Sequence, residues 1–258
     1  MKIVHPICCG MDIHKNIIVA TIATTDKNGI TTYSQQSFST MNSDVIKLRD
    51  WLLQNNCKKA CMESTGKYWI PIWNILESEI ELTLAHPKYT KAIKGKKTDK
   101  KDSKWIADLF KHDLVPNSFI PPKDIRMLRD LSRYRYKLTY IKVSEKNRIQ
   151  NCMTMSNIRI DSVLTDPFGK SARNIMNDVL NNSNFNVDDI SKHLKKSALK
   201  KEDQIKSALQ DFSISSDQHL KMEIAYNHLD CIDEYISSIE KELDNLVSPY
   251  ENYISLLS

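Results

Sequence analysis

The sequence has few glycines, no long apolar run and no paired cysteine motif. Its 258 residues include five glycines, and no glycine-rich phosphate loop follows the first apolar segment, which disfavours an actin-like sugar or acetate kinase. No apolar run approaches the length of a membrane span, and the N-terminus lacks the apolar core and cleavage site of a signal peptide. The six cysteines form no CxxC pair and no zinc-like Cys/His spacing. We therefore expect a cytoplasmic protein with no membrane partner and with reduced, mostly buried thiols.

Positive charge is concentrated in the middle of the sequence. The formal net charge is only +5, but residues 88–111 contain nine lysines and three aspartates, a local net charge of +6. Residues 123–159 carry +7, and the rest of the chain carries −8. A basic middle on an otherwise acidic chain is typical of a nucleic-acid-binding protein. A long solvated helix is the alternative reading of this pattern.

The first 115 residues predict an α/β domain. β-branched runs around the DKNG turn at Asp26–Gly29 predict a meander of three antiparallel strands. Helical and strand patterns then alternate, which implies parallel strands added to the same sheet. This order is expected of an RNase H-like (RuvC-like) mixed sheet with flanking helices. The predicted strands are His5–Met11, Ile17–Thr24, Thr31–Phe38, Lys59–Glu63 and Glu81–Ala85, and the predicted helices are Ser43–Gln54, Tyr68–Glu79, Lys88–Ile93 and one that begins near Asp99.

The remaining residues predict helices. Lys123–Met155 reads as one long basic helical arm, whose interleaved tyrosines (Tyr134, Tyr136 and Tyr140) we expect to pack rather than to stack on bases. Residues 116–216 hold this arm and a small polar helical region with segments near 172–180 and 188–199. In 217–258, apolar residues at spacings of 3 and 4 between 222 and 246 predict an acidic coiled coil. It pairs either with its own copy or with an earlier helix of the chain.

Four carboxylates stand at the ends of predicted elements. Asp12 ends the first strand, Glu63 ends the fourth, and Asp99 and Asp102 begin the helix after the fifth. The first and fourth strands of an RNase H-like sheet are neighbours, and residues three apart share one side of a helix, so these side chains can meet. Their repulsion requires cations. Two Mg²⁺ or Mn²⁺ ions roughly 3.5–4 Å apart can activate a water or hydroxyl for attack on a phosphodiester. The alternative is a solvated helix start with Thr98 as its N-cap.

Basic side chains surround these carboxylates and also lie along the helical arm, and in both places they can contact phosphates. We assign no metal-ligand role to His14, His86 or His112, because a lone histidine near a strand end is more often structural. The candidate nucleic-acid contacts are Lys15, Lys96, Lys97, Lys100, Lys101, Arg126, Arg129, Arg133, Arg135, Lys142, Lys146 and Arg148.

Several motifs occur together, in one order and at family-like distances. They resemble the RuvC-like N-terminal domain and helical arm of the DEDD transposases of bacterial insertion sequences, the insertion sequence one-ten family. The resemblance covers about residues 5 to 180. The motifs are GMDIHK (Gly10–Lys15), MESTGKYW (Met62–Trp69), the segment Ala85–Leu109, LRDLSRYRYKL (Leu128–Leu138) and EKNRIQNCM (Glu145–Met153).

The resemblance implies both a function and a set of metal ligands. Asp12, Glu63, Asp99 and Asp102 match the family's D-E-D-D ligands, which implies metal-dependent DNA cleavage and strand exchange in transposition. The implied partners are transposon-end and target DNA, a guide (bridge) RNA as in some members, and a further copy bound through the 218–247 coiled coil.

One departure from the family pattern concerns a second domain. The family carries a serine nucleophile in a C-terminal domain, and this sequence stops at Ser258, where that domain should begin. We therefore expect the N-terminal part of a transposase, incomplete for full activity. A stand-alone junction nuclease and a non-catalytic, nucleic-acid-binding dimerisation module with a structural acidic cluster remain alternatives.

Overall fold

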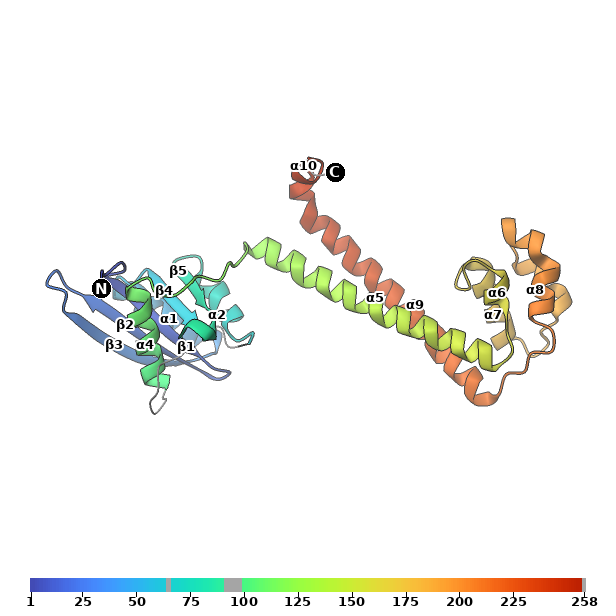
Figure 1. Cartoon of the computed structure of the whole chain (residues 1–258), viewed down its shortest axis with the longest axis horizontal. Helices are drawn as coiled ribbons and strands as arrows, with labels where there is room; N and C mark the ends of the chain where they lie inside the picture. Colours follow the sequence, from blue (N-terminus) through green and yellow to red (C-terminus); the bar gives the residue numbers. More distant parts are fainter. Residues whose placement is uncertain (64–65, 91–98, 257–258) are drawn as a thin grey trace. The chain divides into compact units, whose positions relative to one another are not determined.

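The protein divides into two compact units, Met1–Lys123 and Asp124–Ser258, which are described separately (Figure 1). The structure, a computed structural model, describes residues 1–63, 66–90 and 99–256, without the side chains of Tyr89, Asp99, Lys196 and Ser197. None of the helices in these ranges is long and apolar enough to cross a membrane. The division into parts at residues 115 and 216 stays a prediction.

The first unit contains a mixed five-stranded sheet of order β3-β2-β1-β4-β5. β1 pairs with β2, and β2 with β3, in antiparallel orientation, whereas β1 pairs with β4, and β4 with β5, in parallel. This arrangement confirms the predicted RNase H-like sheet. The strands are β1 (Ile7–Ile13), β2 (Ile17–Thr25), β3 (Thr31–Ser39), β4 (Lys59–Glu63) and β5 (Glu81–Ala85).

Helices cover both faces of this sheet because its central strands are apolar on both sides. α1 (Asn42–Gln54) and α2 (Trp69–Leu76) pack on the face that carries Met11 and Ile13. α4 (Asp99–Lys111) covers the opposite face (Figure 1). It packs there against Cys8, Ala23 and Cys61. α3 (Pro87–Thr90) follows β5 directly. Residues 91–93 of the predicted helix Lys88–Ile93, and Thr98 as an N-cap, lie outside the described residues.

α4 lies against the backbone of β1 at Gly10. A Cβ atom at Gly10 would stand 2.3 Å from the backbone nitrogen of Ala107 and 2.3 Å from the carbonyl oxygen of Ser103. The Ser103 hydroxyl also hydrogen-bonds Thr21 at 2.8 Å, and Gln35 reaches the same hydroxyl at 3.1 Å. These contacts fix α4 over β1 and β2.

The second unit is a long helical hairpin with a small helical cap. α5 (Lys123–Met155) and α9 (Ser216–Val247) run antiparallel, because residue numbers rise on one helix as they fall on the other in their ion pairs. Those pairs are Arg135–Glu240, Lys142–Asp233 and His228–Glu145. α6 (Ile160–Val163), α7 (Lys170–Asn181), η1 (Val187–His193), η2 (Lys196–Lys201) and α8 (Glu202–Ala208) form a common core with the hairpin; η3 (Ser248–Tyr250) and α10 (Glu251–Ile254) follow α9.

The structure corrects two expectations from the sequence and refines a third. β1 continues to Ile13, so Asp12 is its penultimate residue rather than its end. The predicted helical segment near 188–199 consists of two 3-10 helices. The interleaved tyrosines of α5 are exposed rather than buried in a packed interface, since Tyr134 is 54% exposed and Tyr136 and Tyr140 are each 61% exposed. Of the partners considered for the acidic helix, α5 of the same chain is the one in contact, and dimerisation stays a prediction.

Candidate functional site

Asp12 and Glu63 stand side by side in the parallel register of β1 and β4. The paired residues are Cys9 with Ala60, Gly10 with Cys61 and Met11 with Met62, so Asp12 and Glu63 occupy the next positions. Paired residues on neighbouring strands point to the same face of a sheet. This face is the one covered by α4, because Cys61, two residues before Glu63, belongs to the cluster with α4. Two carboxylates from adjacent strands thus share one edge and one face.

The direction of α4 relative to β1 follows from two contacts. Cys8 contacts the carbonyl of Ala107, whereas Gly10 lies against Ser103 and Ala107, so α4 runs antiparallel to β1. Toward its N-terminus α4 therefore advances along β1 in the direction of Asp12, and the carbonyl of Lys100 in its first turn accepts a hydrogen bond of 2.8 Å from Gln35 of β3. The side chain of Asp99 lies outside the described part, and Asp102 is half-buried.

Neighbouring polar groups hold the two strand carboxylates. Asp12 is 6% exposed, and its Oδ2 atom lies 3.2 Å from Nε2 of His14. The hydroxyl of Thr90 donates a hydrogen bond of 3.0 Å to Oε2 of Glu63. The carboxylate of Asp12, the more deeply buried of the two, needs compensation by hydrogen bonds, by an opposite charge or by a metal ion.

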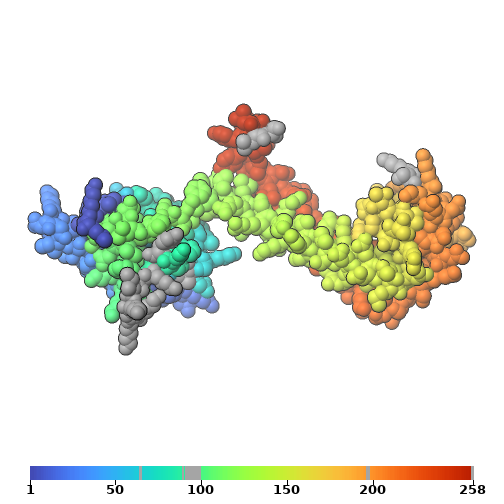
Figure 2. Space-filling view, in the orientation of Figure 1, coloured from blue at the N-terminus to red at the C-terminus, as the bar shows by residue number. Residues whose placement is uncertain are grey.

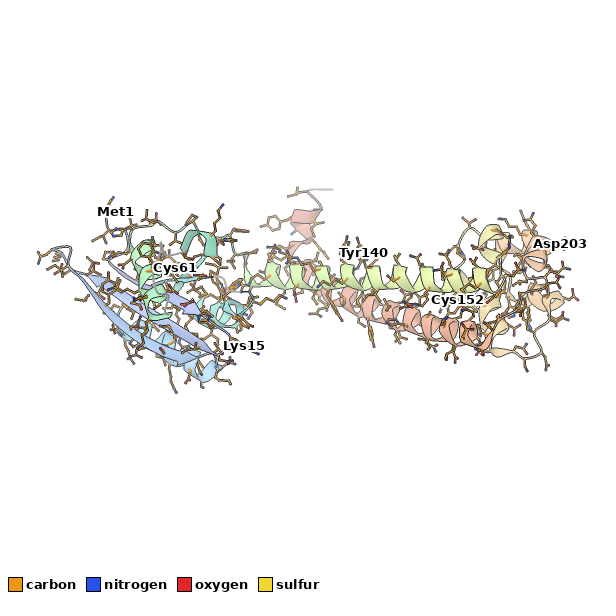
Figure 3. All side chains as sticks on the ribbon, turned by 60° about the horizontal axis from the view of Figure 1, so that its bottom comes forward. Met1, Lys15, Cys61, Tyr140, Cys152 and Asp203 are labelled. Carbon is orange, nitrogen blue, oxygen red and sulfur yellow. The ribbon has the colours of Figure 1, made fainter. Side chains whose placement is uncertain are left out.

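The chemistry of the donor groups fits a hard divalent cation. Burial, followed by the neighbouring charges of Cys8 and Glu63, raises the pKa of the Cys61 thiol far above its ordinary value. Cys61 (labelled in Figure 3) therefore stays protonated and supplies no thiolate. Carboxylate oxygens favour Mg²⁺ or Mn²⁺, whereas thiolates and imidazoles favour zinc. Among the side chains that the structure describes, a set without Asp99, no group of three or more His, Cys, Asp or Glu residues forms a ready metal site.

The predicted basic residues near this site have different surroundings. Lys15, labelled in Figure 3, lies exposed in the turn between β1 and β2. Lys100 and Lys101 are exposed on the first turn of α4. Lys96 and Lys97 fall outside the described residues. Cations beside carboxylates can attract a phosphate backbone without occupying the metal positions.

The basic residues of α5 belong to the second unit and form two sets. Arg135, Lys142 and Arg148 are in ion pairs, and Lys146 lies 5.0 Å from the ring centre of Phe168. Arg126 is half-buried, whereas Arg129 and Arg133 are exposed. The sequence alone does not separate these two sets.

Sequence reasoning missed the residues that position the site. Thr90 lies inside the motif Ala85–Leu109, but a threonine gives no periodic signal for its contact with Glu63. Gly10 belongs to the motif GMDIHK, but the motif did not predict that α4 packs directly against the backbone at this glycine. A glycine beside a carboxylate in a strand is a usable signal, since glycine in a strand often marks a close backbone approach.

The sequence matches a family model described as "Transposase", that of the DEDD transposases of the insertion sequence one-ten family, over residues 9–158. This match spans more than half of the chain, and the chain belongs to this family. The family places the protein among transposases, enzymes that act on DNA. No curated protein matches the sequence.

Two solved structures are similar to the chain at low levels. RuvC of Thermus thermophilus aligns with a TM-score of 0.34 and 8% identity, over 43% of this chain and 99% of RuvC. The resolvase of Fowlpox virus, solved with Holliday junction DNA, aligns with a TM-score of 0.27 and 17% identity, over 40% of this chain and 72% of the resolvase. Values this low support no conclusion, so the fold assignment rests on the strand order of the sheet.

Proposed function

We propose that the first unit is the metal-dependent DNA-cleaving domain of the transposase. In this proposal Asp12, Glu63, Asp99 and Asp102 hold two Mg²⁺ or Mn²⁺ ions. The observation that carries it is the position of Asp12 and Glu63 on adjacent parallel strands, on the face of the sheet that α4 covers. Bound ions would activate a water or hydroxyl for attack on a phosphodiester bond.

The protein's own residues have three tasks in this proposal. Burial keeps water away from Asp12, and His14 orients its carboxylate from 3.2 Å. Thr90 fixes one oxygen of Glu63 through its hydroxyl and leaves the other for a ligand. The exposed Lys15 and Lys100 attract the DNA backbone toward the carboxylates.

The proposed substrates are the transposon ends and the target DNA, with a guide RNA as a further partner. The basic residues of α5 are proposed contacts for these nucleic acids, and α9 is a proposed contact between copies of the chain. Family membership supports the DNA substrate. The local excess of positive charge on α5 supports nucleic-acid binding in general.

Calorimetry of Mn²⁺ and Mg²⁺ binding to the full chain tests the metal site. The test variants are Asp12→Asn, Glu63→Gln, Asp99→Asn and Asp102→Asn, each of which keeps the shape of the side chain but removes its charge. Asp50→Asn on α1 is the matched control, because α1 covers the opposite face of the sheet. We expect each test variant to weaken metal binding by at least about tenfold, and the control to bind as the wild type does.

Metal-dependent cleavage of branched DNA is the second readout. The four test variants should lose it, and Asp50→Asn should keep it. Metal binding that is absent, or equal in all five variants, even with DNA present, would refute the proposed site. The chain would then be better described as a nucleic-acid-binding module.

A further inference from the structure

The second unit separates the cations of α5 into neutralised and available side chains. Arg135 binds Glu240, with 2.6 Å between the guanidinium and the carboxylate, and Lys142 binds Asp233. Arg148 binds Glu145, which is buried between the helices. The first two pairs link α5 to α9, and all three cations already have an acidic partner. They are therefore poor candidates for strong phosphate contacts.

A different face of α5 carries a row of exposed cations and aromatic rings. The row consists of Arg129, Arg133, Tyr136 and Tyr140, at spacings of 4, 3 and 4 residues. With about 3.6 residues per turn, such positions lie on one side of a helix and here extend over about 16 Å. Neither Arg129 nor Arg133 is in an ion pair with any residue that the structure describes. Figure 2 shows the surface of α5 facing the viewer along most of its length.

The two tyrosines form a small, neutral aromatic platform. Their ring centres are 4.8 Å apart at an interplanar angle of 73°, and their hydroxyls hydrogen-bond at 2.9 Å. Each residue is 61% exposed (Tyr140 is labelled in Figure 3). The hydrogen bond with Tyr140, and then burial, raise the pKa of Tyr136, so its hydroxyl stays uncharged and does not repel phosphate. Exposed aromatic faces beside free guanidinium groups bind bases by stacking and phosphates by charge.

We propose that this row binds an unpaired stretch of a nucleic-acid strand. Arg129 and Arg133 contact its phosphates, and bases stack on Tyr136 and Tyr140. A duplex hides the faces of its bases, so only an unpaired stretch can use the tyrosines. The inference deepens the nucleic-acid binding proposed for α5 and does not depend on the metal site.

The charge of the row argues against a second copy of the chain as its occupant. Self-association through this face would bring four guanidinium groups of Arg129 and Arg133 together without a carboxylate in the row itself. Asp130, three residues before Arg133, is an exposed carboxylate beside the row, but the two are in no ion pair among the described residues, and the two arginines leave the row with a net positive charge. A polyanion is the complementary partner.

Fluorescence anisotropy of labelled oligonucleotides on the full chain tests the row. The probes are a uridine RNA, a thymidine DNA and a DNA duplex of equal length, all in EDTA so that no metal contributes. We expect Tyr136→Ala and Tyr140→Ala each to weaken single-strand binding about tenfold, and Tyr136→Phe to retain most of the affinity. Duplex binding should change less than twofold. Arg133→Ala should reduce the salt dependence of binding to both kinds of probe.

Two control variants show whether binding depends on this row in particular. Tyr235→Ala removes a tyrosine of α9 that is 56% exposed and should bind all probes as the wild type does. Asp50→Asn on α1, outside both proposed sites, should also bind all probes as the wild type does. Because EDTA removes divalent ions from these measurements, a failure of metal binding refutes only the metal site. Tighter binding of either the uridine RNA or the thymidine DNA supports the inference and shows which kind of single strand the row binds. Unchanged single-strand binding by the alanine variants, an equal loss for the duplex, or a change of oligomeric state instead would overturn it.

Discussion

The substitution Gly10→Ala tests how α4 is held over the carboxylate strands. The added Cβ would stand 2.3 Å from two backbone atoms of α4, those of Ser103 and Ala107, whereas ordinary van der Waals contact begins at 3.4 Å. The helix must therefore move by about 1 Å, since neither atom belongs to a flexible side chain. Overpacking of this kind costs about 1–3 kcal/mol. Strain on the Thr21–Ser103 hydrogen bond adds about 1 kcal/mol, so we expect a loss of about 3 kcal/mol.

Tryptophan fluorescence during urea unfolding measures this loss selectively. All four tryptophans of the chain, Trp51, Trp69, Trp73 and Trp105, lie in the first unit. Their signal therefore reports the free energy of unfolding of that unit and not that of the helical hairpin. A lower urea concentration at the unfolding midpoint, with an unchanged dependence of the free energy of unfolding on urea concentration, would indicate a loss of stability without a change in the surface exposed on unfolding.

Gly29→Ala is the control for the conformational effect of adding a Cβ. Gly29 has φ of +81° and no neighbour within 4 Å, so its substitution adds backbone strain of about 1 kcal/mol but no collision. Gly10→Ala should lower the affinity for Mn²⁺ as well, because displacement of α4 moves Asp102, whereas Gly29→Ala should not. If Gly10→Ala is no less stable than Gly29→Ala, the conclusion that the backbone of α4 packs directly against Gly10 of β1 is refuted.

Three further predictions concern thiols, acid stability and the hairpin. Cys231 is the exposed cysteine, while burial raises the pKa of Cys8 to about 12, so a thiol reagent should modify one cysteine rapidly in the folded chain and the other five only in denaturant. The hydrogen bond from His193 lowers the pKa of Asp178 to about 2. The ionised carboxylate therefore stabilises the folded second unit fully above pH 3.8, and this stabilisation is lost as the pH falls toward 2. Asp178→Asn should make the stability of the second unit less dependent on pH in this range, as measured by far-UV circular dichroism. Glu145→Gln should lower the free energy of unfolding of the second unit by about 1–3 kcal/mol, because the buried carboxylate accepts hydrogen bonds from Arg148 and His228. Thermal unfolding followed by far-UV circular dichroism measures this loss, and equal melting temperatures for the variant and the wild type would contradict the prediction.

The sequence by itself determined the elements and the order of the sheet. The strands Lys59–Glu63 and Glu81–Ala85 and the helix Lys123–Met155 have the predicted bounds. Their signals are local: alternation with a period of two, a turn after each strand and a helical stripe of apolar residues. Asp12 and Glu63 were found in the same way, since each stands at or near the end of an apolar strand. The predicted approach of Asp99 remains a proposal, because its side chain is not described.

Only the tertiary structure decided which of the chemically similar side chains are engaged. Arg133 and Arg135 are two residues apart in one basic helix, yet only Arg135 meets an acidic residue of α9, from which it is separated by about a hundred positions in the chain. The seat of α4 on Gly10 and the contact of Thr90 with Glu63 likewise depend on how distant elements dock. No local pattern encodes these contacts, because they are fixed by the packing of one element against another and not by the period of either.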